Sequence, residues 1–255
     1  MKEYTFDAAK TAEDLIQWTK DYFAAAGEGT KAVLGMSGGK DSTVSAAILA
    51  KALGPERVIG VSMPQGSQSL NEADKICETL GIKMYTVNIG KACDALMEAI
   101  ADAGEELTKA SVQNIPPRVR MATLYAIGQT NNARVVNTCN LSEDYIGYAT
   151  KFGDGAGDFS LLANLTVTEV LAIGDYLGVP YRWVHKTPDD GLPHSCPDEE
   201  KIGFTYAELD VYIRTGKAPE GYVHDNEAEG LKVDKIDRMN RANLHKLLPM
   251  PAFKV

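Results

Sequence analysis

Short apolar runs rich in β-branched residues alternate along most of the chain with longer stretches whose apolar positions recur at helical spacing. Continuously apolar strands are typical of a parallel sheet, because helices then bury both of its faces. The pattern predicts strands over residues 31–36, 57–63, 82–88, 134–138 and 180–184, and helices over residues 9–26, 43–53, 70–80, 91–103, 117–131 and 167–177. We therefore expect an α/β fold, a doubly wound parallel five-stranded sheet with helices on both faces.

Two segments combine glycine, proline and aspartate and are predicted to be loops, residues 151–160 and 187–197. Sheets of this kind bind ligands in loops at the carboxyl ends of their strands, so these loops are expected to border a site. The sequence has no internal repeat, and its 255 residues suit one α/β domain. We expect residues 1–255 to form that single domain.

A glycine turn joins the first predicted strand to the second predicted helix. Its sequence, Ser-Gly-Gly-Lys-Asp-Ser over residues 37–42, offers unhindered backbone N–H groups beside a positive helix end. Such a turn binds anions, phosphates above all. It is not a Walker A loop, because Leu34 stands where that motif needs glycine and Asp41 follows Lys40 where it needs serine or threonine. As an alternative without function, the turn is simply a tight strand-to-helix connection.

Composition and charge narrow the function classes. With 35 acidic and 26 basic residues the formal charge is -9, which gives no general attraction for nucleic acid or for an anionic membrane. The sequence offers neither a secretory leader nor an apolar stretch of membrane-spanning length, so we expect a cytoplasmic protein. The four cysteines are far apart and are expected to be buried free thiols.

The Ser-Gly-Gly-x-Asp-Ser loop resembles that of the ATP pyrophosphatases, which cleave ATP between its α and β phosphates. Three later segments, residues 114–121, 137–143 and 147–158, look like consecutive signatures of NAD synthetases. The resemblance continues through Asp198-Glu199 and residues 203–206 to His245-Lys246, and it covers nearly the whole chain from Ala32. On these motifs the sequence is identified as a member of the NAD synthetase family, with a Rossmann-like ATP pyrophosphatase fold.

The resemblance implies a ligase that uses ATP and Mg²⁺ to convert deamido-NAD to NAD with ammonia, through an adenylated intermediate. Relatives that use glutamine carry an additional hydrolase domain before this one; here the phosphate loop begins at Ser37, so no glutaminase domain is expected. The resemblance also implies a homodimer. A separate glutaminase subunit as the source of ammonia is left open.

The resemblance further implies roles for individual residues. The catalytic group is expected to be Ser37, Asp41, Ser42 and Glu143, with Mg²⁺ held by Asp41 and Glu143. Glu143 follows a predicted strand end, from which its carboxylate can reach the ion that Asp41 binds. ATP is expected to contact Gly35, Met36, Ser37, Gly38, Gly39, Lys40, Asp41, Ser42, Thr138, Val167 and Asp189. Deamido-NAD is expected to contact Arg118, Lys151, Asp154, Asp158, His245 and Lys246.

The chain departs from the commonest family pattern in three places. Val167 stands where a lysine is usual, Asp189 where a small hydroxyl residue is usual, and Asn137 where glycine is usual. Losing a cation and gaining a carboxylate weakens anion binding, and we hypothesise that Lys186 supplies the missing charge. Two alternatives remain at this stage: another adenylating enzyme such as a tRNA thiolase, and a nucleotide-binding protein without activity.

Overall fold

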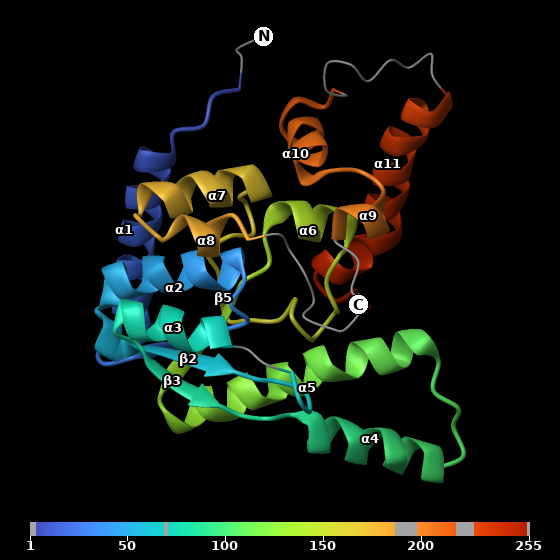
Figure 1. Ribbon diagram of the computed structural model, residues 1–255, viewed down its shortest axis with the longest axis horizontal. Coiled ribbons are helices and arrows are strands. Elements are labelled where there is room, and N and C mark those ends of the chain that lie inside the picture. The colour runs from blue at the N-terminus through green and yellow to red at the C-terminus, as the bar shows by residue number, and fades with distance from the viewer. Residues whose placement is uncertain (1–3, 69–70, 187–197, 218–226, 254–255) are drawn as a thin grey trace.

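The computed structural model describes residues 4–68, 71–186, 198–217 and 227–253 (Figure 1). A five-stranded parallel sheet lies at its centre, in the order β3-β2-β1-β4-β5. The order changes direction between β1 and β4, where a doubly wound sheet opens a crevice at its carboxyl edge. The strands are β1 (Lys31–Gly35), β2 (Val58–Ser62), β3 (Lys83–Thr86), β4 (Ala133–Asn137) and β5 (Phe159–Ser160).

Side chains of the central strands alternate between two apolar cores. Val33 pairs with Ile59 of β2 and with Val135 of β4, and these three side chains join the core on one face. Their neighbours Leu34 and Val136 belong to the core on the other face. Burial on both faces explains why these strands read as continuously apolar in the sequence, and it confirms the predicted doubly wound fold.

Helices cover both faces of the sheet (Figure 1). On one face lie α1 (Ala8–Ala26), α2 (Lys40–Leu53), α3 (Asn71–Leu80), α7 (Val167–Tyr176) and α8 (Tyr181–Val184). On the other lie α4 (Gly90–Asp102) and α5 (Lys109–Thr130). A single 3₁₀ turn, η1 (Pro55–Arg57), leads into β2. In the described part of the chain, no helix combines the length and apolar composition that crossing a membrane requires.

The sequence pattern placed the fifth strand wrongly. Residues 180–184 form the short helix α8, whose N-cap is Pro180 and which buries Trp183 and Val184. The fifth strand is β5, which pairs Phe159 with Val136 at the edge of β4. Only two residues long, β5 has no periodicity to be recognised, and it forms because the preceding loop brings it alongside β4.

Helix α5 begins earlier than the prolines suggest. We expected it to start at residue 117, but it starts at Lys109 and contains Pro116 and Pro117. Thr108 caps the new start, because its side chain accepts a hydrogen bond from the Ser111 N–H. This cap and the packing of Ile115 into the core stabilise the part of the helix that precedes the two prolines.

A further group of helices, one after β4 and three at the end of the chain, was not predicted from the sequence pattern. It comprises α6 (Leu141–Ile146), α9 (Asp198–Ile202), α10 (Tyr206–Thr215) and α11 (Glu227–Leu247), the last three in orange and red in Figure 1. These helices share a third apolar cluster with α7, formed by Ile146, Val167, Ile202, Phe204, Tyr206, Leu209 and Ile236. The cysteines Cys77, Cys93 and Cys139 are buried and free as expected, while Cys196 lies outside the described residues.

A buried ion pair fastens α10 to α7. The Glu169 side chain is 3% exposed, and its Oε1 accepts a hydrogen bond of 2.7 Å from Arg214 Nε. Arg214 also donates to the carbonyl oxygen of Asn164 at 2.8 Å, and the Tyr4 hydroxyl donates to Glu169. A buried carboxylate needs such partners, because burial without them carries a large desolvation cost.

Replacing Arg214 by Met is expected to lower the free energy of unfolding by about 3 kcal/mol at pH 7, because Glu169 then loses its cation. Burial alone would raise the pKa of Glu169, but hydrogen bonds from Arg214 and Tyr4 lower it below its usual 4.5. This stabilisation is complete above pH 4.5 and is lost as the pH falls through the lower folded-state pKa. Urea unfolding at pH 7, and again at a pH below the folded-state pKa of Glu169, measures the effect. Arg238→Met on exposed Arg238 is the control, and equal losses in the two variants at pH 7 would contradict the prediction.

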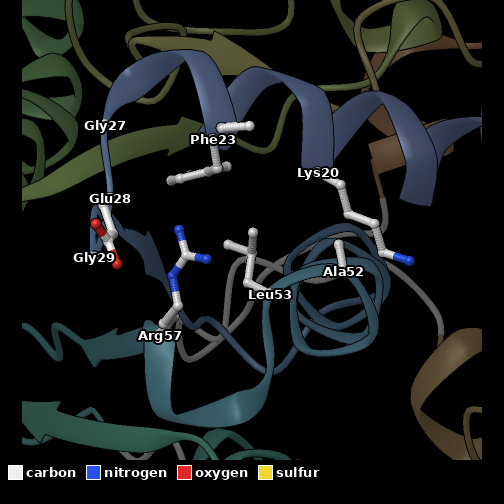
Figure 2. A pocket seen from close by; sticks show the side chains of 9 residues that line it. Lys20, Phe23, Gly27, Glu28, Gly29, Ala52, Leu53 and Arg57 are labelled. Carbon is white, nitrogen blue, oxygen red and sulfur yellow. The ribbon is translucent and has the colours of Figure 1, made fainter.

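A cavity of about 330 Å³ opens between the ends of α1 and α2 (Figure 2). It lies beside the turn of residues 27–29 that precedes β1, and therefore at the amino edge of the sheet. Arg57 lines it, but its guanidinium donates to the Thr30 carbonyl oxygen and lies over the Phe23 ring. The cavity is thus away from the carboxyl edge where ligands of such sheets bind, and its one arginine is engaged in packing.

Candidate functional site

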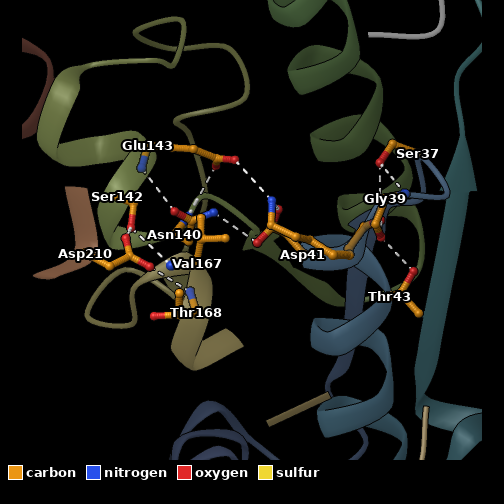
Figure 3. A network of polar contacts seen from close by, with 12 residues as sticks. Ser37, Gly39, Asp41, Thr43, Asn140, Ser142, Glu143, Val167, Thr168 and Asp210 are labelled. Atoms are coloured by element: carbon orange, nitrogen blue, oxygen red, sulfur yellow. Dashed lines mark hydrogen bonds and ion pairs between the residues drawn. The ribbon is translucent and has the colours of Figure 1, made fainter. Parts of the chain in front are cut away.

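The glycine turn forms a loop at the carboxyl end of β1. Gly38 has φ +80°, a left-handed conformation that suits glycine, and Gly39 is the N-cap of α2 without any side-chain cap. Ser37 Oγ accepts a hydrogen bond from Gly39 N at 3.2 Å and lies 3.3 Å from Ser42 Oγ, while Thr43 Oγ1 donates to the Gly39 carbonyl oxygen at 2.7 Å (Figure 3). The loop is therefore held in shape by its own side chains, and it presents the amino end of α2 to an anion.

Two carboxylates meet beside this loop. Asp41 lies in the first turn of α2, and Glu143 lies in the first turn of α6, which follows β4. The ammonium of Lys40 lies between them, 2.8 Å from Asp41 Oδ2 and 3.8 Å from Glu143 Oε1. The proximity predicted from the two strand ends is thus observed, with a lysine nitrogen between the acids.

Asn140 joins the two acids, a role that sequence reasoning missed. Its Nδ2 donates to Asp41 Oδ1 at 3.0 Å, and its Oδ1 accepts from Glu143 N at 3.0 Å (Figure 3). It is also the N-cap of α6, in a capping box that Glu143 completes. The signal was present in the sequence, because asparagine followed three residues later by glutamate is the pattern of such a box.

Burial and charge shape the titration of this cluster. Burial raises the pKa of Glu143, and the negative charge of nearby Asp41 raises it further. Burial alone would lower the pKa of Lys40, but the charges of Asp41 and Glu143 outweigh it and raise that pKa. The ammonium therefore stays charged, and its positive charge lowers the pKa of Glu143 against the effects of burial and of Asp41.

A second polar network connects the start of α6 to α10 and to the start of α7. Asp210 of α10 is 3% exposed and accepts hydrogen bonds from Ser142 Oγ and, at 2.7 Å, from Thr168 N (Figure 3). Ser142 Oγ in turn accepts from Val167 N at 3.1 Å. Because Ser142 precedes Glu143, this network fixes the helix start from which the Glu143 carboxylate projects.

The residues expected at the dinucleotide form a second group. Arg118 Nε donates to the Lys151 carbonyl oxygen at 3.4 Å, and Lys151 Nζ donates to the His245 carbonyl oxygen. Lys246 Nζ donates to the carbonyl oxygens of Gly147 at 2.6 Å and Ala149 at 3.0 Å. The structure thus brings together four basic residues from α5, α11 and the loop after α6.

A cradle that binds anions and a pair of carboxylates around a cation suit a phosphate-bearing nucleotide and a divalent ion. The comparison with known proteins decides the family: the sequence profile described as NAD synthase matches residues 11–250. The chain belongs to the NAD synthase family.

Relatives of this family match most of the chain. An NH(3)-dependent NAD(+) synthetase of Carboxydothermus hydrogenoformans is 37% identical over 237 residues, 92% of this chain and 93% of the relative. The solved structure of NMN synthetase from Francisella tularensis superimposes with a TM-score of 0.84 at 31% identity, covering 98% of this chain and 100% of that one. NAD+ synthetase from Burkholderia pseudomallei gives a TM-score of 0.72 at 30% identity, covering 96% and 92%.

The remaining residues expected from the family resemblance lie in varied surroundings. Thr138 is half-buried directly after β4. The Val167 side chain packs in the apolar cluster shared by α6, α7 and α10, so it adds no polar group to the ATP loop. Asp189 lies outside the described residues, as does the predicted loop of residues 187–197. Lys186 is exposed, and its compensating role stays a prediction.

Asp154 and Asp158, which are predicted to contact the dinucleotide, stabilise the loop between α6 and β5. The backbone oxygen of Asp154 accepts from Asn137 Nδ2 at 3.0 Å, and its carboxylate accepts from Thr150 N at 2.8 Å. Both carboxylate oxygens of Asp158 also have partners in the chain, Val135 N at 2.8 Å and the Tyr125 hydroxyl at 3.3 Å. In this structure they shape the loop; a contact with substrate stays a prediction.

Gly157 lets this loop lie against β4, and Gly157→Ala is expected to lower the free energy of unfolding by about 2 kcal/mol. A methyl group there would lie 2.6 Å from Asn137 N and 2.7 Å from Asn137 Cβ, so loop and strand would have to separate. Gly155→Ala is the matched control, because the nearest atom to its methyl group is the Thr150 carbonyl oxygen at 3.4 Å. Equal unfolding midpoints for the two variants in urea would contradict this prediction.

Proposed function

We propose that the chain is an ammonia-dependent NAD synthetase, which amidates the nicotinate carboxylate of deamido-NAD with consumption of ATP. The observation that carries the proposal is the meeting of Asp41 and Glu143 beside the Ser37 to Ser42 loop, around the positive charge of Lys40. Family membership and curated relatives of that name support it. A nucleotide-binding protein without activity would have no need of a carboxylate pair at the phosphate loop.

The donor set of the site fits Mg²⁺. Two carboxylates from separate helices approach one point, and the ammonium of Lys40 between them supports the assignment of a cation site there. Mg²⁺ in proteins commonly takes one or two carboxylates and completes its shell with water and phosphate oxygens. We therefore assign Asp41 and Glu143 as its ligands. When bound, the ion would neutralise charge on the phosphates and on the departing pyrophosphate.

The reaction divides into two steps, in which the substrate carboxylate first attacks the α phosphorus of ATP and pyrophosphate leaves. We assign the stabilisation of the leaving group to the positive amino end of α2 and to the hydroxyls of Ser37 and Ser42, whose Oγ atoms lie 3.3 Å apart beside it. Ammonia then attacks the acyl carbon of the adenylate, and AMP leaves. Arg118 and Lys151 orient the acid substrate by charge. No covalent enzyme intermediate is required.

The test is an incubation of the purified chain with ATP, MgCl₂, ammonium chloride and deamido-NAD, in which NAD and pyrophosphate are both measured. Equal amounts of the two products are expected. No NAD at any ammonium concentration would overturn the proposal, and pyrophosphate without NAD would indicate another acid substrate. Glutamine in place of ammonium tests the nitrogen donor; no NAD is expected from it.

The likeness to an NMN synthetase supports one second candidate, amidation of a nicotinate mononucleotide. The reaction forms the same amide bond, but the mononucleotide substrate lacks the AMP half of deamido-NAD. Parallel assays with the two acids distinguish the candidates, because a larger kcat/KM for the mononucleotide would favour the second. The homodimer and the cytoplasmic location expected from the sequence stay predictions, and sedimentation velocity measures the first.

A further inference from the structure

Lys40 occupies an unusual position for a lysine. Its side chain is 6% exposed, although lysine is rarely buried to this extent without a partner. It also stands in the first turn of α2, where the positive end of the helix disfavours a cation. Both costs have to be offset by its surroundings.

The surroundings are a cage of two acids and an aromatic ring. Lys40 Nζ lies 2.8 Å from Asp41 Oδ2, 3.8 Å from Glu143 Oε1 and 5.7 Å from the centre of the Tyr206 ring. The Tyr206 hydroxyl is buried and has no hydrogen-bond partner among the described residues. The ammonium is therefore held chiefly by the carboxylates to which we assign Mg²⁺.

A divalent ion on these carboxylates and the ammonium cannot share this point. Lys40 brings one positive charge to the two carboxyl groups and Mg²⁺ would bring two, so adding the ion beside Lys40 would place like charges in contact. The four-carbon stem of lysine has several rotatable bonds, so the ammonium can move away from the carboxylates while the backbone stays in place. Lys40 is the first residue of α2, so its side chain starts at the helix end that we assign to the phosphates of ATP.

We propose that Lys40 is the exchangeable counter-ion of this site: it holds the place of a cation between Asp41 and Glu143 until Mg²⁺ binds, and its ammonium then moves to the phosphate groups of ATP. The proposal rests on the proposed function for the identity of the nucleotide. It also gives a source for the positive charge that Val167 does not supply. Mg²⁺ alone must displace Lys40, whereas Mg²⁺ with ATP offers Lys40 new anionic partners.

The test is a calorimetric titration of MgCl₂ into the full chain without nucleotide. Lys40→Met removes the competing cation and keeps an unbranched stem, so Mg²⁺ is expected to bind at least about tenfold more tightly than to the wild type. In the assay with ATP the variant is expected to be the weaker binder: its KM for ATP should exceed that of the wild type, because the phosphates lose the Lys40 ammonium. Equal or weaker Mg²⁺ binding to Lys40→Met in the absence of nucleotide would overturn the proposal.

Three further variants make the result specific. Lys10→Met, at an exposed lysine paired with Asp14, should leave Mg²⁺ affinity unchanged. Lys40→Met combined with Asp41→Asn should lose the gain, because the ion then lacks one ligand. Lys40→Gln keeps a neutral donor for Asp41 and serves if the methionine variant does not fold. A purely structural Lys40 would lower the melting temperature of its variants without any gain in Mg²⁺ affinity, which overturns the proposal.

The proposal and the function on which it rests fail in different ways. NAD formation by the wild type together with equal Mg²⁺ affinities would remove only the role of Lys40. Tighter Mg²⁺ binding to Lys40→Met without NAD formation by the wild type would remove only the assigned reaction.

Discussion

Asp41→Asn is expected to reduce NAD formation by about a thousandfold, because one of the two assigned Mg²⁺ ligands loses its charge where pyrophosphate departs. The folded structure is expected to persist. Asparagine has nearly the shape of aspartate, and it can keep the hydrogen bond with Asn140 that Asp41 makes at 3.0 Å. Buried Lys40 nevertheless loses the charge of its partner at 2.8 Å, so a loss of about 3 kcal/mol in the free energy of unfolding is expected.

Initial rates at saturating ATP, ammonium and deamido-NAD measure the Asp41 effect, and urea unfolding of the same protein checks its stability. Asp14→Asn repeats the chemical change at an exposed aspartate of α1 and is expected to keep the wild-type rate. A folded Asp41→Asn protein that retained a tenth or more of the wild-type rate would show that Asp41 is not a required ligand.

Asp210→Ala is expected to lower the free energy of unfolding by about 3 kcal/mol. The substitution removes the acceptor shared by Ser142 Oγ and Thr168 N in a region that is closed to water. Burial raises the pKa of Asp210, and the hydrogen bonds oppose that rise only in part. Asp210→Asn should lose less, because the amide keeps one acceptor oxygen for the two donors.

Urea unfolding of the two Asp210 variants, with Asp234→Ala at an exposed position of α11 as control, gives the comparison. Because the network holds the start of α6, the alanine variant is also expected to have a lower kcat. The KM for deamido-NAD should change little, since Arg118 and Lys151 lie in the other group of polar residues. Stability equal to that of the wild type would mean that solvent or another residue replaces the acceptor.

The parts of the fold that the sequence predicted are those with local signals. The strand before Ser37 has an unbroken apolar run, and the two glycines and Asp41 of the loop predict an anion-binding turn without any tertiary information. The meeting of Asp41 and Glu143 could also be predicted, because carboxyl ends of parallel strands share one edge of a sheet.

The parts that the sequence did not predict depend on distant partners. Asp210 lies 68 residues from Ser142, and no local pattern around it distinguishes it from a surface acid. The same is true of Lys40, whose neighbour along the chain, Asp41, was foreseen, while its contact with Glu143 across the site was not. The short strand β5 exists only because Phe159 pairs with Val136, so a periodicity argument cannot detect it.

The change of direction in the strand order has a consequence for assembly. Asp41 comes from the half of the chain that builds β1, β2 and β3, whereas Asn140 and Glu143 come from the half that builds β4 and β5. Neither half contains a complete cation site. A divalent ion bound by both Asp41 and Glu143 would therefore stabilise the docking of the two halves. A nucleotide that contacts both halves would bind tightly only when they are docked in the correct register.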